Sequence, residues 1–210
     1  MIMSKARLEA FSDGVFAILI TILVLEFKVP SYRTGHLWQG IMHQWPEFLA
    51  YGVSYFYVGT LWLFHHDYFA SLKVIDRNLN LLNLLSMFSV TLLDYPMILV
   101  ATAIASGNST DVRTGFMIYA TVALFISAVY YWLYRYLHDH QELMSTTNLV
   151  IDHSVQLDPV RSMILYGLAI IGAIWSNWVG GLLLLAGIIF HFIAYLHLSK
   201  QHQSTKSTEA

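Results

Sequence analysis

The sequence of 210 residues contains no cysteine, which excludes disulfide bonds, thiolate metal sites and cysteine nucleophiles. Only 11% of the residues are charged, against roughly a quarter in soluble proteins. The net charge of −2 excludes a basic footprint for nucleic acid. The sequence also lacks the Thr-Val-Gly-Tyr-Gly filter of some ion channels, a Walker A motif, a Gly-x-Ser-x-Gly elbow and a His-Glu-x-x-His metal motif. We therefore expect neither an enzyme nor a resident cofactor or metal ion.

Long apolar runs dominate the chain instead. Hydrophobic residues make up 57% of it, more than a soluble fold of this size can bury, so we predict an all-α membrane protein. Six runs approach the roughly 20 residues that cross a bilayer, at 8–28, 47–71, 79–105, 114–137, 160–177 and 179–199. These runs predict a six-helix transmembrane domain over 1–199, followed by a polar tail over 200–210. The first run is too long for a cleaved signal peptide and lacks a small-residue cleavage site.

Lysine and arginine are shared unevenly between the two sides of this predicted bundle. The side that contains both termini holds eight of them: Lys5, Arg7, Lys73, Arg77, Arg135, Arg161, Lys200 and Lys206. The opposite side holds only Lys28, Arg33 and Arg113. Because cytoplasmic loops carry the excess of these residues, both termini are expected in the cytoplasm.

The first apolar run has distinct faces when it is drawn as a helix with about 100° per residue. One stripe collects Phe11, Gly14, Ile18, Thr21, Ile22 and Leu25. Ser12 and Asp13 lie roughly 120° and 140° away from Ile18, so they face different neighbours. An apolar stripe ordinarily packs against another helix or lipid, and the wheel alone does not identify a pore.

Charged and polar residues accompany the first two spans. Buried charge is costly in lipid, so Asp13 marks either a functional site or a lock between helices, whereas Arg7 has the alternative of reaching the cytoplasmic interface. Trp62, His65 and His66 lie toward the cytoplasmic end of the second span. Adjacent histidines point about 100° apart on a helix, which disfavours a shared metal site. One of them is expected to hydrogen-bond within the bundle, with Asp13 as its natural partner.

The third span contains a second polar feature. Pro96 is expected to kink the helix and to free backbone carbonyls near residue 92. Asp94 is either hydrogen-bonded toward the protein interior or part of a proton or ion site. Glu26, at the outer end of the first span, lies either at the membrane interface or at a mouth that attracts cations.

Two motifs carry a resemblance to a known family. The first helix reads Arg7-x-x-x-Phe11-Ser12-Asp13-Gly14 and continues as Ile18-x-x-Thr21-Ile22-x-x-Leu25. The second span contains Trp62-x-x-His65-His66. Together they resemble the transmembrane protein 175 family, and the six spans resemble its single-repeat prokaryotic form across essentially the whole chain. Members of this family are cation channels, potassium-selective to varying degrees, of prokaryotes and endolysosomal membranes.

The resemblance implies a tetramer in which the first helices surround a central pore. It places the hydrophobic constriction at Ile18, with further rings at Ile22 and Leu25, and potassium would pass near Ile18 and the hydroxyl of Thr21. It also implies a signature network on the cytoplasmic side that positions the pore helix. That network comprises Arg7, Phe11, Ser12, Asp13, Trp62, His65 and His66.

We therefore expect a homotetrameric, moderately potassium-selective cation channel in a prokaryotic plasma membrane, with itself and the lipid bilayer as partners. A narrow apolar ring gates by dewetting, because a hydrated ion loses water there without replacement oxygens. The alternative is a proton-coupled membrane transporter that uses Asp94 and the histidines. A third possibility is a structural membrane protein without transport.

Overall fold

The computed structural model describes residues 4–145 and 153–208, and regular structure in these ranges is helical apart from one isolated bridge between Leu72 and Met144. The elements are α1 (Lys5–Leu23), the 3₁₀ turn η1 (Val24–Glu26), α2 (Leu37–His43), α3 (Trp45–Ala70), α4 (Arg77–Thr91), α5 (Asp94–Ser106), α6 (Ser109–Asp139), the 3₁₀ turn η2 (Gln141–Leu143), α7 (His153–Trp175) and α8 (Asn177–Thr208). The polar residues after 199 thus continue α8 as a helix to Thr208.

Five segments of the described chain are long and apolar enough to cross a bilayer: Lys5–Glu26, Arg77–Ser106, Ser109–Asp139, Asp158–Trp175 and Asn177–His197. They confirm an all-α membrane protein. The predicted second span corresponds to α3, whose 26 residues reach about 39 Å. It is not among the five, because its tyrosines and histidines lower its hydropathy, and its crossing of the membrane stays a prediction.

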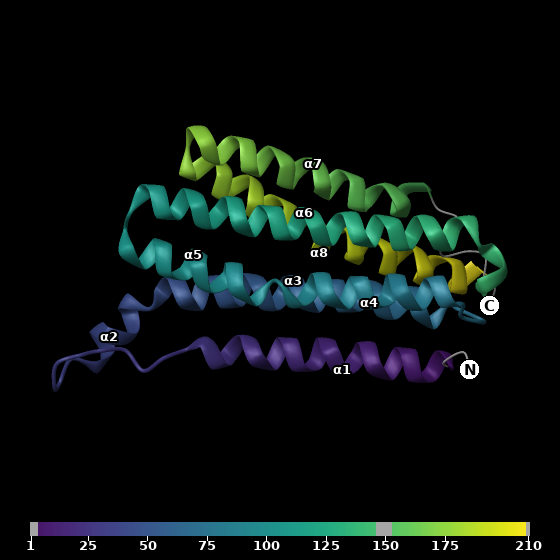
Figure 1. Ribbon diagram of the computed structural model, residues 1–210, viewed down its shortest axis with the longest axis horizontal. Helices are drawn as coiled ribbons and strands as arrows, with labels where there is room; N and C mark the ends of the chain where they lie inside the picture. The colour runs from purple at the N-terminus through teal and green to yellow at the C-terminus, as the bar shows by residue number, and fades with distance from the viewer. Residues whose placement is uncertain (1–3, 146–152, 209–210) are drawn as a thin grey trace.

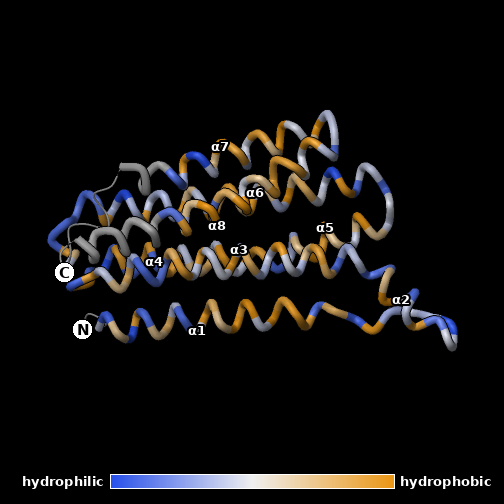
Figure 2. The backbone as a smooth tube through the Cα atoms, turned by 180° about the vertical axis from the view of Figure 1, so that it is seen from behind, coloured by the Kyte–Doolittle hydropathy of each residue, from blue (hydrophilic) through white to orange (hydrophobic). Residues whose placement is uncertain are grey.

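The helices run roughly side by side, with α1 at one edge of the bundle and α7 at the opposite edge (Figure 1). Seen from behind, the order is the same, and both chain ends lie at one end of the molecule (Figure 2). Helix α1 packs chiefly against α3 and α4, while α6, α7 and α8 pack on one another. One side of α1 therefore contacts the bundle, and no helix of the described residues packs closely on the other side.

The predicted third span is divided into two helices. Helix α4 ends at Thr91 and α5 begins at Asp94, which makes Pro96 the third residue of α5. Proline has no N–H to donate, and its ring clashes with the carbonyl four residues earlier, which is the carbonyl of Leu92. The disruption thus falls at the predicted position. Leu92 and Leu93 between the two helices keep right-handed helical dihedrals, and Arg77–Ser106 is still one apolar segment long enough to span a membrane.

The last two spans form a tight hairpin, with only Ser176 between α7 and α8. A Cβ atom on Gly180 would lie 2.5 Å from the Cβ of Ala173 and 2.7 Å from its Cα. A glycine at this position therefore lets the two backbones touch, as small residues do between membrane helices.

Candidate functional site

Helix α1 has one buried face, formed by Leu8, Ser12, Phe16, Leu19 and Leu23. These residues recur every three or four positions, so they share one side of the helix, and this side packs on α3 and α4. Ser12 is the only polar residue among them and is fully buried. A buried hydroxyl requires a hydrogen-bond partner, and its partners define the centre of the site.

Three buried side chains from three helices form a hydrogen-bonded chain. His65 Nε2 lies 2.7 Å from Asn83 Oδ1, and Asn83 Nδ2 donates to Ser12 Oγ over 2.9 Å. The Ser12 hydroxyl in turn lies 3.0 Å from the Leu8 carbonyl, to which it donates. His65 and Asn83 are each 1% exposed. This chain ties α1 to α3 and α4 with directional bonds in a region that is otherwise apolar.

The second polar link between α1 and α3 joins Asp13 to Trp62. The indole Nε1–H of Trp62 donates to Asp13 Oδ1 over 2.8 Å. The expected hydrogen bond between Asp13 and a histidine is not formed, because His65 is bonded to Asn83 instead. His66 is exposed and lies beside the Trp62 ring, tilted by 35° with 5.6 Å between the ring centroids, so His65 is the histidine that faces the bundle.

The predicted signature residues therefore divide into two groups. Ser12, Asp13, Trp62 and His65 are joined by the two polar links. The Arg7 guanidinium is exposed and forms no hydrogen bond or ion pair with the described residues, and Phe11 and His66 are also exposed.

The face of α1 opposite Ser12 is open. Ile18 is 60% exposed, and Leu25, in the adjoining turn η1, is 73% exposed. Phe11, Thr21 and Ile22 are also exposed, whereas Gly14 is half-buried. The Thr21 hydroxyl donates within its own helix, to the Ile18 carbonyl at 2.8 Å. The residues of the predicted stripe thus lie together on the side that faces away from the bundle.

Asn83 is the central residue of this site that the sequence analysis missed. It lies on the buried face of α4, together with Leu79, Ser86, Met87 and Val90. A helical period that places one amide among buried apolar residues is the signal that identifies it. An amide both donates and accepts, which lets Asn83 join a hydroxyl to an imidazole.

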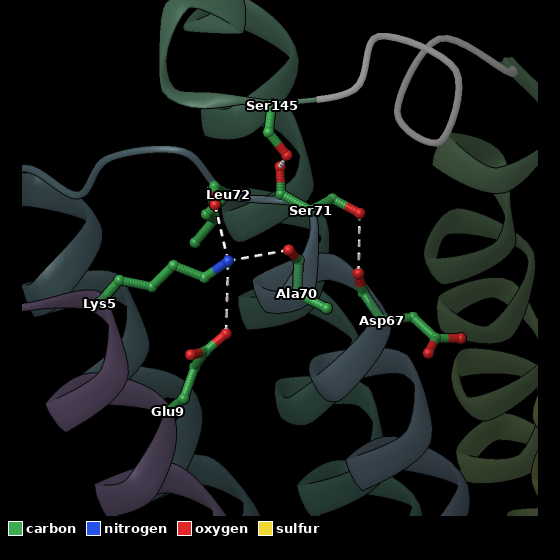
Figure 3. A network of polar contacts seen from close by, with 7 residues as sticks. All are labelled: Lys5, Glu9, Asp67, Ala70, Ser71, Leu72 and Ser145. Carbon is green, nitrogen blue, oxygen red and sulfur yellow. Dashed lines mark hydrogen bonds and ion pairs between the residues drawn. The ribbon is translucent and has the colours of Figure 1, made fainter.

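Lys5 is the second missed residue, since the sequence analysis used it only to orient the chain. Its ammonium donates to the backbone carbonyls of Ala70 at 2.8 Å and Leu72 at 2.7 Å. It also lies 3.6 Å from a carboxylate oxygen of Glu9 (Figure 3). The start of α1 is therefore held at the C-terminal end of α3.

The C-terminal end of α1 borders a cavity of about 140 Å³, whose lining includes Glu26, Lys28, Glu47 and Tyr51. One carboxylate oxygen of Glu47 is buried, as is one of Asp94, and neither has a hydrogen-bond partner within the described ranges. No group of three or more His, Asp or Glu side chains in those ranges is placed to hold a metal ion.

Comparison with known proteins places these residues in a wider context. The family described as the endosomal/lysosomal potassium channel TMEM175 matches residues 7–93, which contain every predicted site residue. A protein of Streptomyces collinus, named as a potassium channel, is 37% identical over 134 residues, or 62% of this chain. The human endosomal/lysosomal proton channel TMEM175 is 40% identical over 94 residues, or 40% of this chain. The matches span 65% of the Streptomyces protein and 19% of the human protein.

The fold is similar to that of a solved structure over almost its whole length. The crystal structure of a lysosomal potassium-selective channel TMEM175 homolog from Chamaesiphon minutus superposes with a TM-score of 0.77. The superposition covers 91% of this chain and 97% of the other, at 28% sequence identity.

Proposed function

This chain belongs to the TMEM175 family, and on that premise we propose that it forms a moderately potassium-selective cation channel. The observation that carries the proposal is the division of α1 into two faces. Ser12 is fully buried and hydrogen-bonded, whereas Ile18, six residues later, is 60% exposed among the described residues. A membrane helix that is anchored on one side and open on the other is suited to lining a path shared between subunits.

The assembly we propose is a homotetramer of six-span subunits, with α3 as the second span and α1 nearest the axis. The open stripe then supplies one Ile18, one Ile22 and one Leu25 from each subunit as stacked apolar rings. Such rings gate by dewetting, because they provide no oxygens to replace the water around an ion. The Thr21 hydroxyl already donates to its own backbone, so it offers only lone pairs to a passing cation. Discrimination between cations should accordingly be weaker than in a carbonyl filter.

The two polar links have a supporting role in this proposal. Side chains leave a helix in fixed directions, about 100° apart from one residue to the next. A rotation of α1 about its own axis therefore turns the Ile18 side chain away from the proposed pore axis. The bonds of Ser12 to Asn83 and of Asp13 to Trp62 oppose such a rotation. They aim the helix and take no part in permeation.

The site of action that we propose is a prokaryotic plasma membrane, with both termini in the cytoplasm. Two observations support it. The excess of Lys and Arg lies on the side of the termini, and the Streptomyces and Chamaesiphon proteins to which the chain is similar are prokaryotic.

Replacement of Ile18 tests the proposal. In planar bilayers, Ile18→Asn should raise the unitary conductance and lower the preference for potassium over sodium, because a polar ring wets the constriction. Ile171→Asn places the same amide on an exposed position of α7, away from α1 (Figure 1), and should change neither quantity. Unchanged conductance and reversal potential in Ile18→Asn would show that Ile18 does not form the constriction.

The alternative of a proton-coupled transporter has one observation in its favour, the buried and unpaired Oδ1 of Asp94. A relay from Asp94 to His65 is not formed, however. The hydrogen-bond partner of His65 is Asn83, which lies on α4, three helical turns before Asp94 at the start of α5. In liposomes, a channel passes potassium down its gradient without a proton gradient, whereas saturating flux that requires protons would favour the transporter.

A further inference from the structure

We infer that Lys5 is a positioning residue of the pore helix, which clamps the start of α1 onto the turn that also holds the α6–α7 connection. The inference rests on the proposed function for its effect on gating, but the clamp itself is a matter of structure. We call the contacts of Lys5 Nζ with the Ala70 and Leu72 carbonyls the Lys5 clamp.

The chemistry of the clamp follows from the end of α3. The last carbonyls of a helix have no partner within it, and they form the negative end of its dipole. An ammonium group has three donors and no acceptor, so it suits such a site. Lys5 directs one donor to each of the two carbonyls and has Glu9 close by. The side chains of Lys5 and Glu9 are only 29% and 32% exposed, so solvent screens these contacts incompletely.

The same turn receives a second segment of the chain (Figure 3). Ser145 donates to the Ser71 carbonyl from both its backbone N–H and its hydroxyl, each over 2.8 Å. The backbone N–H of Lys73 donates to the Leu143 carbonyl over 2.7 Å. Residues 70–73 are thus bonded on one side to α1 and on the other to the segment that follows α6. A displacement of that segment is transmitted to the start of the pore helix through this turn.

The Lys5 clamp restricts tilting of the first turns of α1 away from α3, which the bonds of Ser12 and Asp13 do not restrict. Ser12 lies seven residues beyond Lys5, which is about 10 Å along the helix. The bonds of Ser12 and Asp13 fix the rotation of α1 at that level, but the turns before it can still lean away from α3. Arg7 is exposed and its side chain makes no bond to a described residue, so it does not help to hold the start of α1 on α3. Loss of the clamp therefore frees the cytoplasmic end of α1 to lean toward the proposed axis and to narrow the path.

Charge removal at Lys5 tests the inference by current recording. In planar bilayers, Lys5→Met should lower the open probability by about threefold to tenfold, the range expected when a partly exposed charged hydrogen bond is lost. Unitary conductance and reversal potential should not change, because Ile18 and Thr21 are untouched. Lys5→Arg should restore the open probability, since a guanidinium also donates to carbonyls. Lys73→Met is the matched control, because Lys73 is exposed at the same turn, and it should record like the unmodified protein.

A second measurement tests the clamp independently of current. Amide hydrogen exchange over the first three turns of α1 should be faster in Lys5→Met than in Lys73→Met, with exchange at residues 16–23 unchanged. Glu9→Gln, which keeps both carbonyl contacts, should give a smaller increase and serves if Lys5→Met does not assemble. Equal exchange in the Lys5 and Lys73 variants, or an altered reversal potential in Lys5→Met, overturns the inference. If the unmodified protein carries no current, the proposed function fails, and hydrogen exchange alone decides whether the clamp exists.

Discussion

Asn83 provides hydrogen-bond partners for two buried polar side chains, Ser12 and His65. It accepts from His65 and donates to Ser12, so a single amide serves two helices that would otherwise each bury an unpaired group. Unpaired polar groups are costly in an apolar interior. Few other residues combine a donor and an acceptor in so small a side chain, and we expect little tolerance for substitution here.

Asn83→Ala should destabilise the folded protein by about 2–4 kcal/mol, because it leaves a buried imidazole N–H and the Ser12 hydroxyl short of partners. The measurement is thermal unfolding in detergent, followed by tryptophan fluorescence. Asn80→Ala is the matched control on the same helix, since the Oδ1 of Asn80 accepts no hydrogen bond from the described residues. It should change the stability by no more than about 0.5 kcal/mol. Equal effects of the two substitutions would contradict the role of Asn83.

Trp62→Phe should weaken the contact of α1 with α3, because phenylalanine keeps an aromatic ring but lacks the N–H that Asp13 accepts. A double-mutant cycle with Asp13→Asn measures this coupling, which we expect at about 1–3 kcal/mol for a hydrogen bond to a carboxylate. Phe64→Leu alters another buried aromatic residue of α3 and should not couple to Asp13. Additive effects of Trp62→Phe and Asp13→Asn would show that the contact contributes nothing.

At the scale of elements, the hairpin of α7 and α8 depends on close backbone approach. Besides Gly180, Gly187 lies against the ring of Tyr166, where an added Cβ would come within 2.5 Å of the ring. Gly167 differs, because a Cβ at that position would meet nothing within 4 Å. Substitution by alanine should therefore destabilise the hairpin at Gly180 and Gly187 and should be tolerated at Gly167.

Gly180→Ala should destabilise the protein by about 1–3 kcal/mol, since the Ala173 backbone cannot move away without separating the helices. Gly167→Ala should be neutral or should stabilise by up to about 1 kcal/mol, because alanine is the better helix former and no clash opposes it. Thermal unfolding of both variants in one detergent compares them directly. A stable Gly180→Ala protein would mean that the hairpin is looser than described.

The elements also show what sequence patterns can and cannot predict. The wheel of the first span correctly separated Ser12 from the Ile18 stripe, because residue spacing on a helix fixes direction. It could not identify the partner of Asp13, since spacing says nothing of which side chain on α3 lies at the same depth. The clash that Pro96 imposes is local, and its position was predictable. The bonds of Lys5 to the carbonyls of Ala70 and Leu72 could not be predicted, because they join residues 65 and 67 positions apart and no local sequence pattern indicates them.

At the scale of the whole molecule, the proposed tetramer makes the edge position of α1 a central one. The open stripe would lie at the axis, and α7, at the far edge of the subunit (Figure 1), would face lipid. In a symmetric assembly, the same residues of every copy meet around the axis. The open apolar stripe of α1 would thus be covered by the same stripe of the other copies.

Single-cysteine variants test this arrangement, and the chain offers a clean background because it contains no cysteine. Oxidation of Ile18→Cys should give disulfide-linked dimers on a non-reducing gel, because disulfides need Cα atoms within about 7 Å. Ile171→Cys on α7 is also exposed and should stay monomeric. A protein that is tetrameric by mass but shows no crosslink in Ile18→Cys would place α1 away from the axis.

The aromatic and histidine content of α3 has a consequence for how the protein is made. In the proposed topology, α3 enters the bilayer although it lacks the hydropathy of the five segments around it. The translocon releases segments into lipid according to their apolarity, so α3 should leave it poorly by itself. Its polar side chains find partners on α1, α4 and α6, through Trp62, His65 and Ser54. Membrane insertion of α3 should therefore be cooperative during biosynthesis, with α1 and α3 retained beside the translocon until α4 and α6 have been synthesised.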